Sequence, residues 1–196
     1  MHPELISLSL FMLVASCSPG PNNIVASYSG FNFGIAKTLP HMIGVIFGFT
    51  TLVTIMNFGL INIFKSFPVL QDILKYSGSI FLIYLAYKIA FSQTNSDNSY
   101  NNPVKFIETF LFQFINPKSV IVAVIMVSTY VEKGENFIKY SSWVIGVAFF
   151  FACFSIMFWT LVGKFLRKFA TNEKFIKGFN YVMSLLLVSC IATFYL

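Results

Sequence analysis

The sequence predicts an all-α integral membrane protein in which six transmembrane helices form two inverted three-helix repeats, with helices one and four broken. Three observations lead to this fold class: an apolar composition, a series of long uncharged segments, and proline-containing motifs inside two of those segments. Of the 196 residues, 57% are hydrophobic and 10% are charged, and the mean hydropathy is +0.76. A soluble domain has about 25% charged residues, so this composition indicates a chain that lies in lipid.

The first apolar segment is too long for one membrane span and contains a break. Residues 5–36 include no Asp, Glu, Lys or Arg. As one α-helix they would measure about 48 Å, against a bilayer core of about 30 Å. The motif Ser-Pro-Gly-Pro-Asn-Asn at 18–23 interrupts this segment. Pro19 and Pro21 lack the N–H that a helix interior requires, and Gly20 permits backbone conformations that other residues avoid.

The remaining apolar segments predict five further spans. Residues 39–64 and 73–91 form the second and third, 105–131 the fourth, and 141–163 and 178–196 the fifth and sixth. The fourth is interrupted by Asn116-Pro117-Lys118, and a polar stretch rich in Asn and Ser occupies 92–102. We therefore expect a first repeat at 1–91, a linker loop at 92–104 and a second repeat at 105–196.

A weak internal repeat relates the two halves. Residues 43–49 match 145–151 at five of seven positions, at an offset of 102, and Lys75 aligns with Lys177 at the same offset. Two repeats of three spans each must insert with opposite orientations, and Gly/Pro-interrupted segments at corresponding places in such repeats point to a transport site. The breaks near 18–23 and 116–118 correspond in position, although their offset is 96 to 98.

The basic residues lie at the ends of segments rather than in one surface block. The net charge is +6, but this distribution disfavours a nucleic-acid partner and indicates a positive-inside bias. Eight basic residues flank the loops after spans one, three and five, and four lie on the opposite side. We therefore expect these loops in the cytoplasm and both termini outside. The eight are Lys37, Lys88, Lys105, Lys164, Arg167, Lys168, Lys174 and Lys177.

The residues of the two breaks are the candidate substrate-binding site. Irregular backbone at membrane depth persists only where protein or a water-filled cavity covers it. Half-helices beginning near Asn22 and Lys118 would direct free N–H groups and the positive end of a helix dipole into such a cavity. Each asparagine can instead cap a broken helix, and both roles stay open. The candidates are Pro19, Gly20, Pro21, Asn22, Asn23, Asn116, Pro117 and Lys118.

Lys118 lies about midway along the predicted fourth span. A lysine at bilayer depth costs several kcal/mol unless it is solvated or paired. It either faces the cavity and attracts a substrate carboxylate or, in a tilted or re-entrant segment, extends to the interface. We favour the first interpretation.

Few residues could couple transport to protons. The candidates are His41, just inside the second span, and Glu108, in the first turns of the fourth, although a structural hydrogen bond and an interfacial charge are the plainer interpretations. Gly44 and Gly48 form a small-xxx-small face that suits close helix packing, and Gly146 is the repeat counterpart of Gly44.

The three cysteines, Cys17, Cys153 and Cys190, lie in apolar runs without metal-ligand spacing. We expect them to be small buried hydrophobic residues, and we expect neither a metal nor a cofactor.

Three segments of the chain resemble the lysine-exporter (LysE/RhtB) family of bacterial amino-acid efflux proteins. They are SPGPNNIVASYSGFNFG, LPHMIGVIFGF and FLFQFINPKS. The resemblance implies six spans, an inner-membrane location, homo-oligomers in at least some members, and export of amino acids or their relatives by proton antiport. It places the substrate site at the two proline motifs. The segments 112–116, 127–131 and 142–147 resemble the cysteine and O-acetylserine exporters. Some relatives with basic cargo carry an acidic residue in span two, which residues 39–64 lack, so small neutral amino acids are the expected cargo.

Two other functions were weighed against export. An intramembrane enzyme needs a nucleophile–base pair or metal ligands at depth, but the chain has only two histidines and no acidic pair inside a span. We therefore expect no enzymatic activity. An uncoupled channel or a non-transporting membrane subunit remains the alternative, although neither requires matched breaks in both halves.

Overall fold

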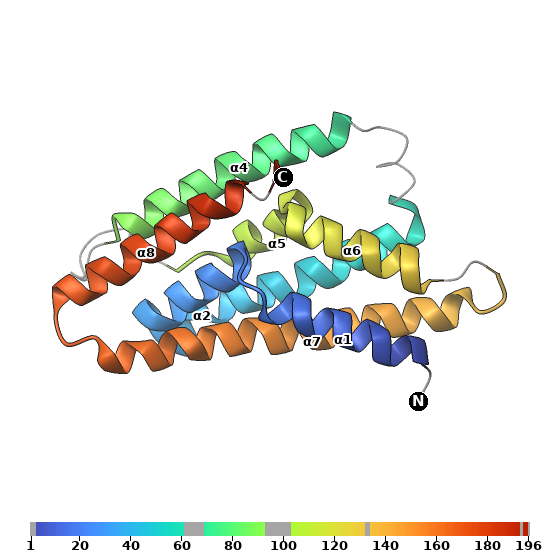
Figure 1. Ribbon diagram of the computed structural model, residues 1–196, viewed down its shortest axis with the longest axis horizontal. Coiled ribbons are helices and arrows are strands. Elements are labelled where there is room, and N and C mark those ends of the chain that lie inside the picture. Colours follow the sequence, from blue (N-terminus) through green and yellow to red (C-terminus); the bar gives the residue numbers. More distant parts are fainter. Residues whose placement is uncertain (1–2, 61–68, 93–102, 132–133, 193, 196) are drawn as a thin grey trace.

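The computed structural model describes residues 3–60, 69–92, 103–131, 134–192 and 194–195, and within these ranges it contains helices and no β-strand. The all-helical prediction is therefore confirmed for the described chain (Figure 1). The elements are α1 (Pro3–Cys17), α2 (Pro21–Ile55) with the π-helical turn η1 (Met56–Leu60), α4 (Val69–Ala90), α5 (Phe106–Ile115), α6 (Pro117–Tyr130), α7 (Phe137–Leu166) with the 3-10 turn η3 (Arg167–Phe169), and α8 (Glu173–Ala192).

Four of these helical stretches are long and apolar enough to cross a membrane, or five if the bent pair α5–α6 counts as one span. The four are Pro21–Gly59, Asp72–Ala90, Phe137–Phe169 and Glu173–Ala192. The axes of α5 and α6 meet at 61°, and α1 is a shorter apolar helix. The chain is therefore a multi-pass membrane protein.

Helix α2 folds back on itself at Gly34. Gly34 has φ 75° and ψ 178°, which is not helical, and the left-handed region is open to glycine at little cost. His41 Nε2 lies 3.3 Å from the carbonyl oxygen of Asn22, nineteen residues away, whereas a straight helix would separate them by about 28 Å. We call residues 21–33 the first limb of α2 and residues 35–55 the second limb.

The two limbs run in opposite directions along α7. Along the first limb, residues with higher numbers contact α7 residues with higher numbers. Along the second limb, residues with higher numbers contact α7 residues with lower numbers. Figure 1 shows the first limb in blue and the second in cyan, both beside α7. The first-limb pairs are Asn23 with Ser155 and Ser27 with Trp159, and the second-limb ring pairs are Phe47 with Phe149 and, in η1, Phe58 with Phe137.

The expected boundary between spans one and two is wrong. The sequence placed a loop at Lys37 because a charge follows the uncharged run, but the turn is at Gly34 and both Lys37 and Pro40 lie within the second limb. The positive φ that reverses the chain selects glycine, whereas a lysine near the end of a span can remain helical and extend to the interface. The linker residues 93–102 and the predicted end of span two, 61–64, lie outside the described residues.

Helices α4 and α8 pair along one edge of the molecule, and α1, α2 and α7 form the opposite edge, with α5 and α6 between them (Figure 1). The first limb crosses α7 in very close contact. A Cβ added at Gly30 would overlap the carbonyl of Thr160, and a Cβ added at Gly163 would overlap the carbonyl of Ser27. Small residues on both helices therefore allow the backbones to touch.

The three glycines predicted to pack behave differently. A Cβ at Gly44 would lie 2.7 Å from the carbonyl oxygen of Phe106, and one at Gly48 would lie 2.8 Å from that of Phe110. Both glycines therefore lie directly against α5. A Cβ at Gly146 would meet no described atom within 4 Å. The packing role expected of Gly146 is wrong, because it lies on the outward face of α7 while Val144 and Ala148 face the core.

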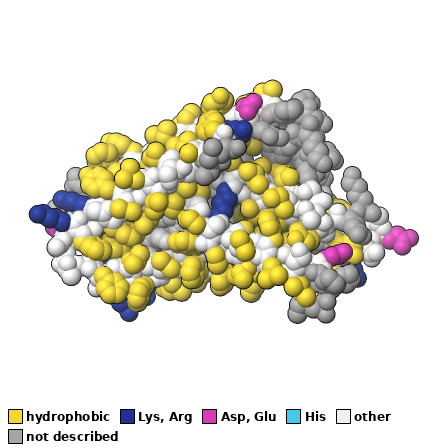
Figure 2. Space-filling model, viewed as in Figure 1, with side chains coloured by type: hydrophobic (Ala, Val, Ile, Leu, Met, Phe, Trp, Pro, Cys, Tyr) yellow, Lys and Arg dark blue, Asp and Glu magenta, His cyan; other side chains and the backbone are white. Residues whose placement is uncertain are grey.

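Apolar side chains cover the outer surface, as a lipid-facing protein requires. Figure 2 shows hydrophobic side chains across most of the visible face, with basic side chains at one end of the long axis, one in the middle of the face and one at the upper edge beside an acidic side chain. The expectation of buried cysteines is wrong: Cys17 is exposed, and Cys153 and Cys190 are partly buried.

Candidate functional site

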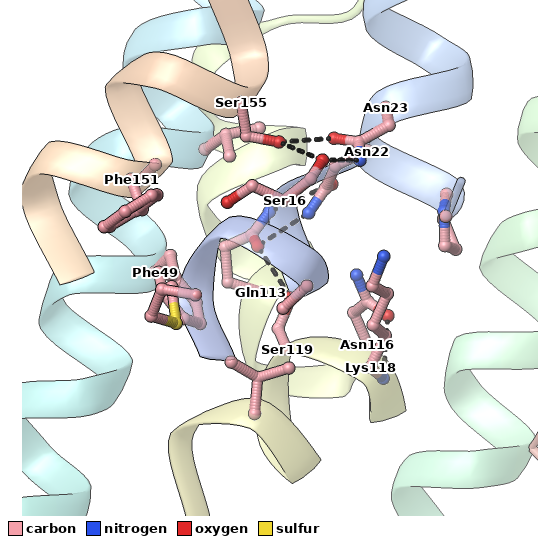
Figure 3. Close-up of a pocket in the computed structure, with 17 residues that line it drawn as sticks. Ser16, Asn22, Asn23, Phe49, Gln113, Asn116, Lys118, Ser119, Phe151 and Ser155 are labelled. Carbon is pink, nitrogen blue, oxygen red and sulfur yellow. Dashed lines mark hydrogen bonds between the residues drawn. The ribbon is translucent and has the colours of Figure 1, made fainter. Parts of the chain in front are cut away.

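A cavity of about 80 Å³ lies where the two broken helices meet (Figure 3). This volume is well above the roughly 10–15 Å³ that a single water molecule needs, so the cavity has room for more than one water. The break between α1 and α2 (residues 18–20, break one) and the break between α5 and α6 (Asn116, break two) both line it. The structure thus brings the two proline motifs together. The polar lining residues near the breaks are Ser16, Asn22, Asn23, Gln113, Asn116, Lys118, Ser119 and Ser155.

At break one, side chains from two other helices hold the end of α1. The carbonyl oxygen of Ser16 accepts hydrogen bonds from Asn23 Nδ2 at 3.2 Å, Ser155 Oγ at 3.1 Å and Trp159 Nε1 at 3.1 Å. Ser155 Oγ also lies 3.2 Å from Asn23 Oδ1. The carbonyls at the end of a broken helix need donors inside a membrane, and here α2 and α7 supply them.

Lys118 ties the two breaks together. Its Nζ donates to the carbonyl oxygen of Ser18 at 2.9 Å and to Ser18 Oγ at 2.8 Å, and it lies 3.5 Å from the carbonyl oxygen of Pro19. A cation at the C-terminal end of a helix is stabilised by the helix dipole. Lys118 lines the cavity as expected, but its ammonium is bonded to break one, a contact that the sequence did not predict.

Gly20 serves the site for a reason other than the one expected. Its φ of −166° and ψ of 172° are extended values that any residue adopts, so the prediction of a special backbone conformation is wrong. A Cβ at this position would lie 2.7 Å from Lys118 Cδ and 2.9 Å from Lys118 Nζ. A side chain at this position would displace the Lys118 side chain, which passes directly over the backbone here.

Gln113 connects the two breaks through a pair of reciprocal amide bonds. Asn22 Nδ2 donates to Gln113 Oε1 at 2.8 Å, and Gln113 Nε2 donates to Asn22 Oδ1 at 3.1 Å. Gln113 Oε1 also accepts from Ser119 Oγ at 3.0 Å, and Nε2 donates to the carbonyl oxygen of Thr109 at 2.9 Å. Gln113 was not among the site residues predicted from the sequence. A glutamine one helical turn before the Asn-Pro motif, on the same face, is the signal that would have identified it.

Asn116 caps α6. Its Oδ1 accepts from the backbone N–H of Lys118 at 3.2 Å, and Pro117 occupies the first helical position, so the capping role left open by the sequence is present. Asn116 is 1% exposed and lines the cavity. Its Nδ2 has no hydrogen-bond partner among the described residues. The first limb of α2 begins after Gly20 without a side-chain cap.

Backbone donors that precede the first intrahelical bonds belong to residues that line the cavity. The first intrahelical bonds are donated by Ile24 in α2 and by Val120 in α6. The N–H groups of Asn22, Asn23 and Ser119 precede these bonds in the first turns, and all three residues line the cavity. Two helix N-termini therefore converge on one space, which is an arrangement suited to an anion.

The two proton-coupling candidates lie apart from the cavity lining. His41 is 2% exposed, with Nδ1 at 3.0 Å from Thr109 Oγ1 and Nε2 at 3.3 Å from the carbonyl oxygen of Asn22. Both contacts of the ring lie behind the cavity wall that Asn22 forms. Glu108 Oε2 accepts from the backbone N–H of Lys105 at 2.9 Å and thereby caps α5.

The cavity contains one ionisable side chain among its described lining residues, that of Lys118. No carboxylate lines it, and no group of His, Cys, Asp and Glu that could hold a metal occurs in the described part of the chain. The remaining walls are apolar. Their residues are Met12, Val45, Phe49, Val122, Phe151 and Ala152.

Comparison with known proteins agrees with a transport site. The family model of the LysE type translocator matches residues 13–195. The chain is 29% identical over 194 residues to the cysteine/O-acetylserine efflux protein of Escherichia coli (strain K12) and to that of Shigella sonnei (strain Ss046), covering 97% of each chain. No solved structure is significantly similar to it. The family match covers most of the chain, and the chain therefore belongs to the LysE type translocator family.

Proposed function

We propose that this protein exports small neutral amino acids or their derivatives across the bacterial inner membrane. Cysteine, O-acetylserine, threonine and homoserine represent the expected range of cargo. Membership of the translocator family and similarity to proteins named cysteine/O-acetylserine efflux proteins support export. The small cavity with apolar walls and no acidic lining residue supports a small cargo without a basic side chain.

The observation that carries the proposal is the convergence of two half-helix N-termini on one cavity. The free N–H groups of Asn22, Asn23 and Ser119 and the amide of Asn116 would bind the substrate carboxylate, and Lys118 would favour it through its charge. Pro19, Pro21 and Pro117 would maintain the breaks that expose these groups.

We propose that the helices form six spans in two inverted repeats, 1–91 and 105–196, joined by the linker loop 92–104. Helix α1 with the first limb of α2 would be span one, the second limb with η1 span two, and α4 span three. The bent pair α5–α6, α7 and α8 would be spans four to six. The fold-back at Gly34 supports this division. Rocking of the repeats about the cavity would give alternating access. The positive-inside bias supports placing both termini outside the cytoplasm.

For proton antiport, we propose His41 rather than Glu108 as the coupling residue. The carbonyl of Asn22 can only accept, so Nε2 of His41 carries a hydrogen. In the neutral ring, Nδ1 must then accept from the hydroxyl of Thr109. In the protonated ring, Nδ1 donates to that hydroxyl, which can turn to the carbonyl of Lys105 at 3.1 Å. A proton at His41 therefore reverses a hydrogen bond beside Gln113, whose amide pairs with Asn22.

Substrate counterflow in proteoliposomes tests the proposal. Vesicles loaded with unlabelled serine or cysteine should accumulate the labelled amino acid transiently, and lysine should not replace either. Lys118→Met and Asn116→Ala should abolish the exchange, while Lys164→Met, at the exposed end of α7, should retain it. An uncoupled channel would equilibrate label without counterflow, and unchanged exchange in both site variants would place the substrate elsewhere.

A further inference from the structure

The acceptors and the donors that line the cavity differ in how far the protein itself uses them. Each side-chain amide oxygen in the lining already accepts a bond from the protein. Asn22 Oδ1 accepts from Gln113, Asn23 Oδ1 from Ser155, and Gln113 Oε1 from both Asn22 and Ser119. Asn116 Oδ1 accepts from the backbone of Lys118. A donor on the ligand would therefore share each of these oxygens with a donor of the protein.

The carbonyls at the end of α1 are occupied as well. Ser16 O accepts from Asn23 Nδ2 and Trp159 Nε1 and shares the one hydrogen of Ser155 Oγ with Asn23 Oδ1. Ser18 O accepts from Asn23 Nδ2 at 3.0 Å and from Lys118 Nζ at 2.9 Å. A broken helix exposes a negative and a positive end. At break one, protein donors satisfy the negative end, whereas the positive end stays open towards the cavity.

The free groups are donors. They comprise the N–H groups of Asn22, Asn23 and Ser119 and Nδ2 of Asn116, whose side chain is almost fully buried at 1% exposure. Lys118 adds a positive charge, and no described lining residue adds a negative one. A carboxylate placed here gains several charge-assisted bonds. An ammonium group would meet a like charge, and each side-chain amide oxygen of the lining already accepts a bond from the protein.

We propose that the cavity recognises its substrate by the carboxylate and does not recognise the amine. N-acylated amino acids and 2-hydroxy acids with small side chains are then substrates alongside the free amino acids. This inference rests on the proposed function, and it names a substrate class wider than amino acids. The apolar wall formed by Phe49, Phe151 and Val122 accepts the side chain or a small acyl group.

Binding to the purified protein tests this selectivity directly. The chain has two tryptophans, and Trp159 Nε1 bonds to Ser16 O at the edge of the cavity, so Trp143→Phe leaves one reporter at the site. The probes are serine, N-acetylserine, serinamide and N-acetylserinamide. N-acetylserine should bind within about tenfold of serine, and serinamide should bind on the order of a hundredfold more weakly, since it loses the bonds to an ionised acceptor. N-acetylserinamide is uncharged and lacks the carboxylate, so its failure to bind excludes net charge as the cause.

Two results would overturn the inference: serinamide binding as tightly as serine, or N-acetylserine failing to bind where serine does. The same four compounds, added as competitors of labelled serine in counterflow with the unmodified chain, give a second measurement that does not depend on the tryptophan variant. If serine exchanges but N-acetylserine does not compete, the inference fails and the proposed function stands. If serine neither binds nor exchanges, both fail.

Discussion

Breaks one and two interrupt their helices in different ways. Break two is one residue long, and its own asparagine caps the helix that follows. Break one is three residues long, has no side-chain cap on the following helix, and is held by Trp159, Ser155 and Lys118 from other helices. Break two is therefore capped by its own residue, whereas break one also depends on donors from α6 and α7.

This difference assigns separate tasks to the two motifs. Break two can persist while the helices around it move, because its cap moves with it. Break one depends on contacts that connect α1 to α6 and α7, so relative motion of these helices must alter it. We therefore expect damage to the supports of break one to have larger effects than damage to the cap of break two.

The largest effect should come from widening the crossing between the first limb and α7. Gly163→Val places a side chain where the carbonyl of Ser27 lies, and two helix backbones cannot relax as a side chain can. We expect destabilisation of about 3 kcal/mol or more, at the upper end for overpacking, measured by thermal unfolding in detergent. Gly146→Val, on the open face of the same helix, is the matched control. Equal loss of stability in both variants would contradict the close crossing.

The next largest effect should follow removal of the lysine that supports break one. Lys118→Met keeps the length of the side chain but leaves the carbonyls of Ser18 and Pro19 without their cationic donor. Hydrogen bonds to charged groups contribute about 1.5–3 kcal/mol, so both stability and counterflow should fall. Lys164→Met tests for a general effect of lost charge. A variant that transports normally would show that Lys118 neither supports the break nor attracts the substrate.

Two variants of Asn116 separate its role as the helix cap from its proposed role in binding the substrate. Asn116→Ala removes both, and we expect a loss of about 1 kcal/mol of stability together with weaker serine binding. Asn116→Asp keeps an oxygen to accept from the N–H of Lys118, so stability should change little, while its negative charge repels a carboxylate and substrate affinity should fall. Thermal unfolding and tryptophan titration of the two variants give the comparison. Retained affinity in Asn116→Asp would restrict Asn116 to capping.

The smallest effect should come from a change at Glu108, whose contacts with Lys105 and Lys88 involve neither break. Its carboxylate is 4.0 Å from Lys88 Nζ, and its side chain is 24% exposed, so the pair contributes at most about 0.5 kcal/mol. Glu108→Gln should transport normally and respond to a pH gradient as the unmodified chain does. His41→Gln should still exchange serine but lose its response to the gradient. The reverse pair of outcomes would identify Glu108, in the first turn of α5, as the coupling residue instead of His41.

The sequence predicted the local features of the molecule and missed those made by distant contacts. Residue type and spacing predict the helix breaks at the prolines, the cap at Asn116 and the close packing at Gly44 and Gly48. The turn at Gly34 was not predicted, because no charge or proline marks it and only its positive φ reveals it. Gln113 and Trp159 were missed because each reads as part of an apolar span. Their polar atoms gain a role only when residues about 90 and 140 positions away fold against them.

The most direct test of the central claim, that both breaks line one substrate site, is protection of a cysteine in the first turn of α6, directly after break two. Ser119→Cys, in a chain with Cys17→Ala, Cys153→Ala and Cys190→Ala, would be labelled with a small water-soluble thiol reagent in the presence and absence of serine. At a serine concentration of roughly ten times Kd, labelling should slow by about tenfold, whereas Ser142→Cys on the exposed face of α7 should be unaffected. Labelling of Ser119→Cys at the same rate with and without bound serine would contradict the account.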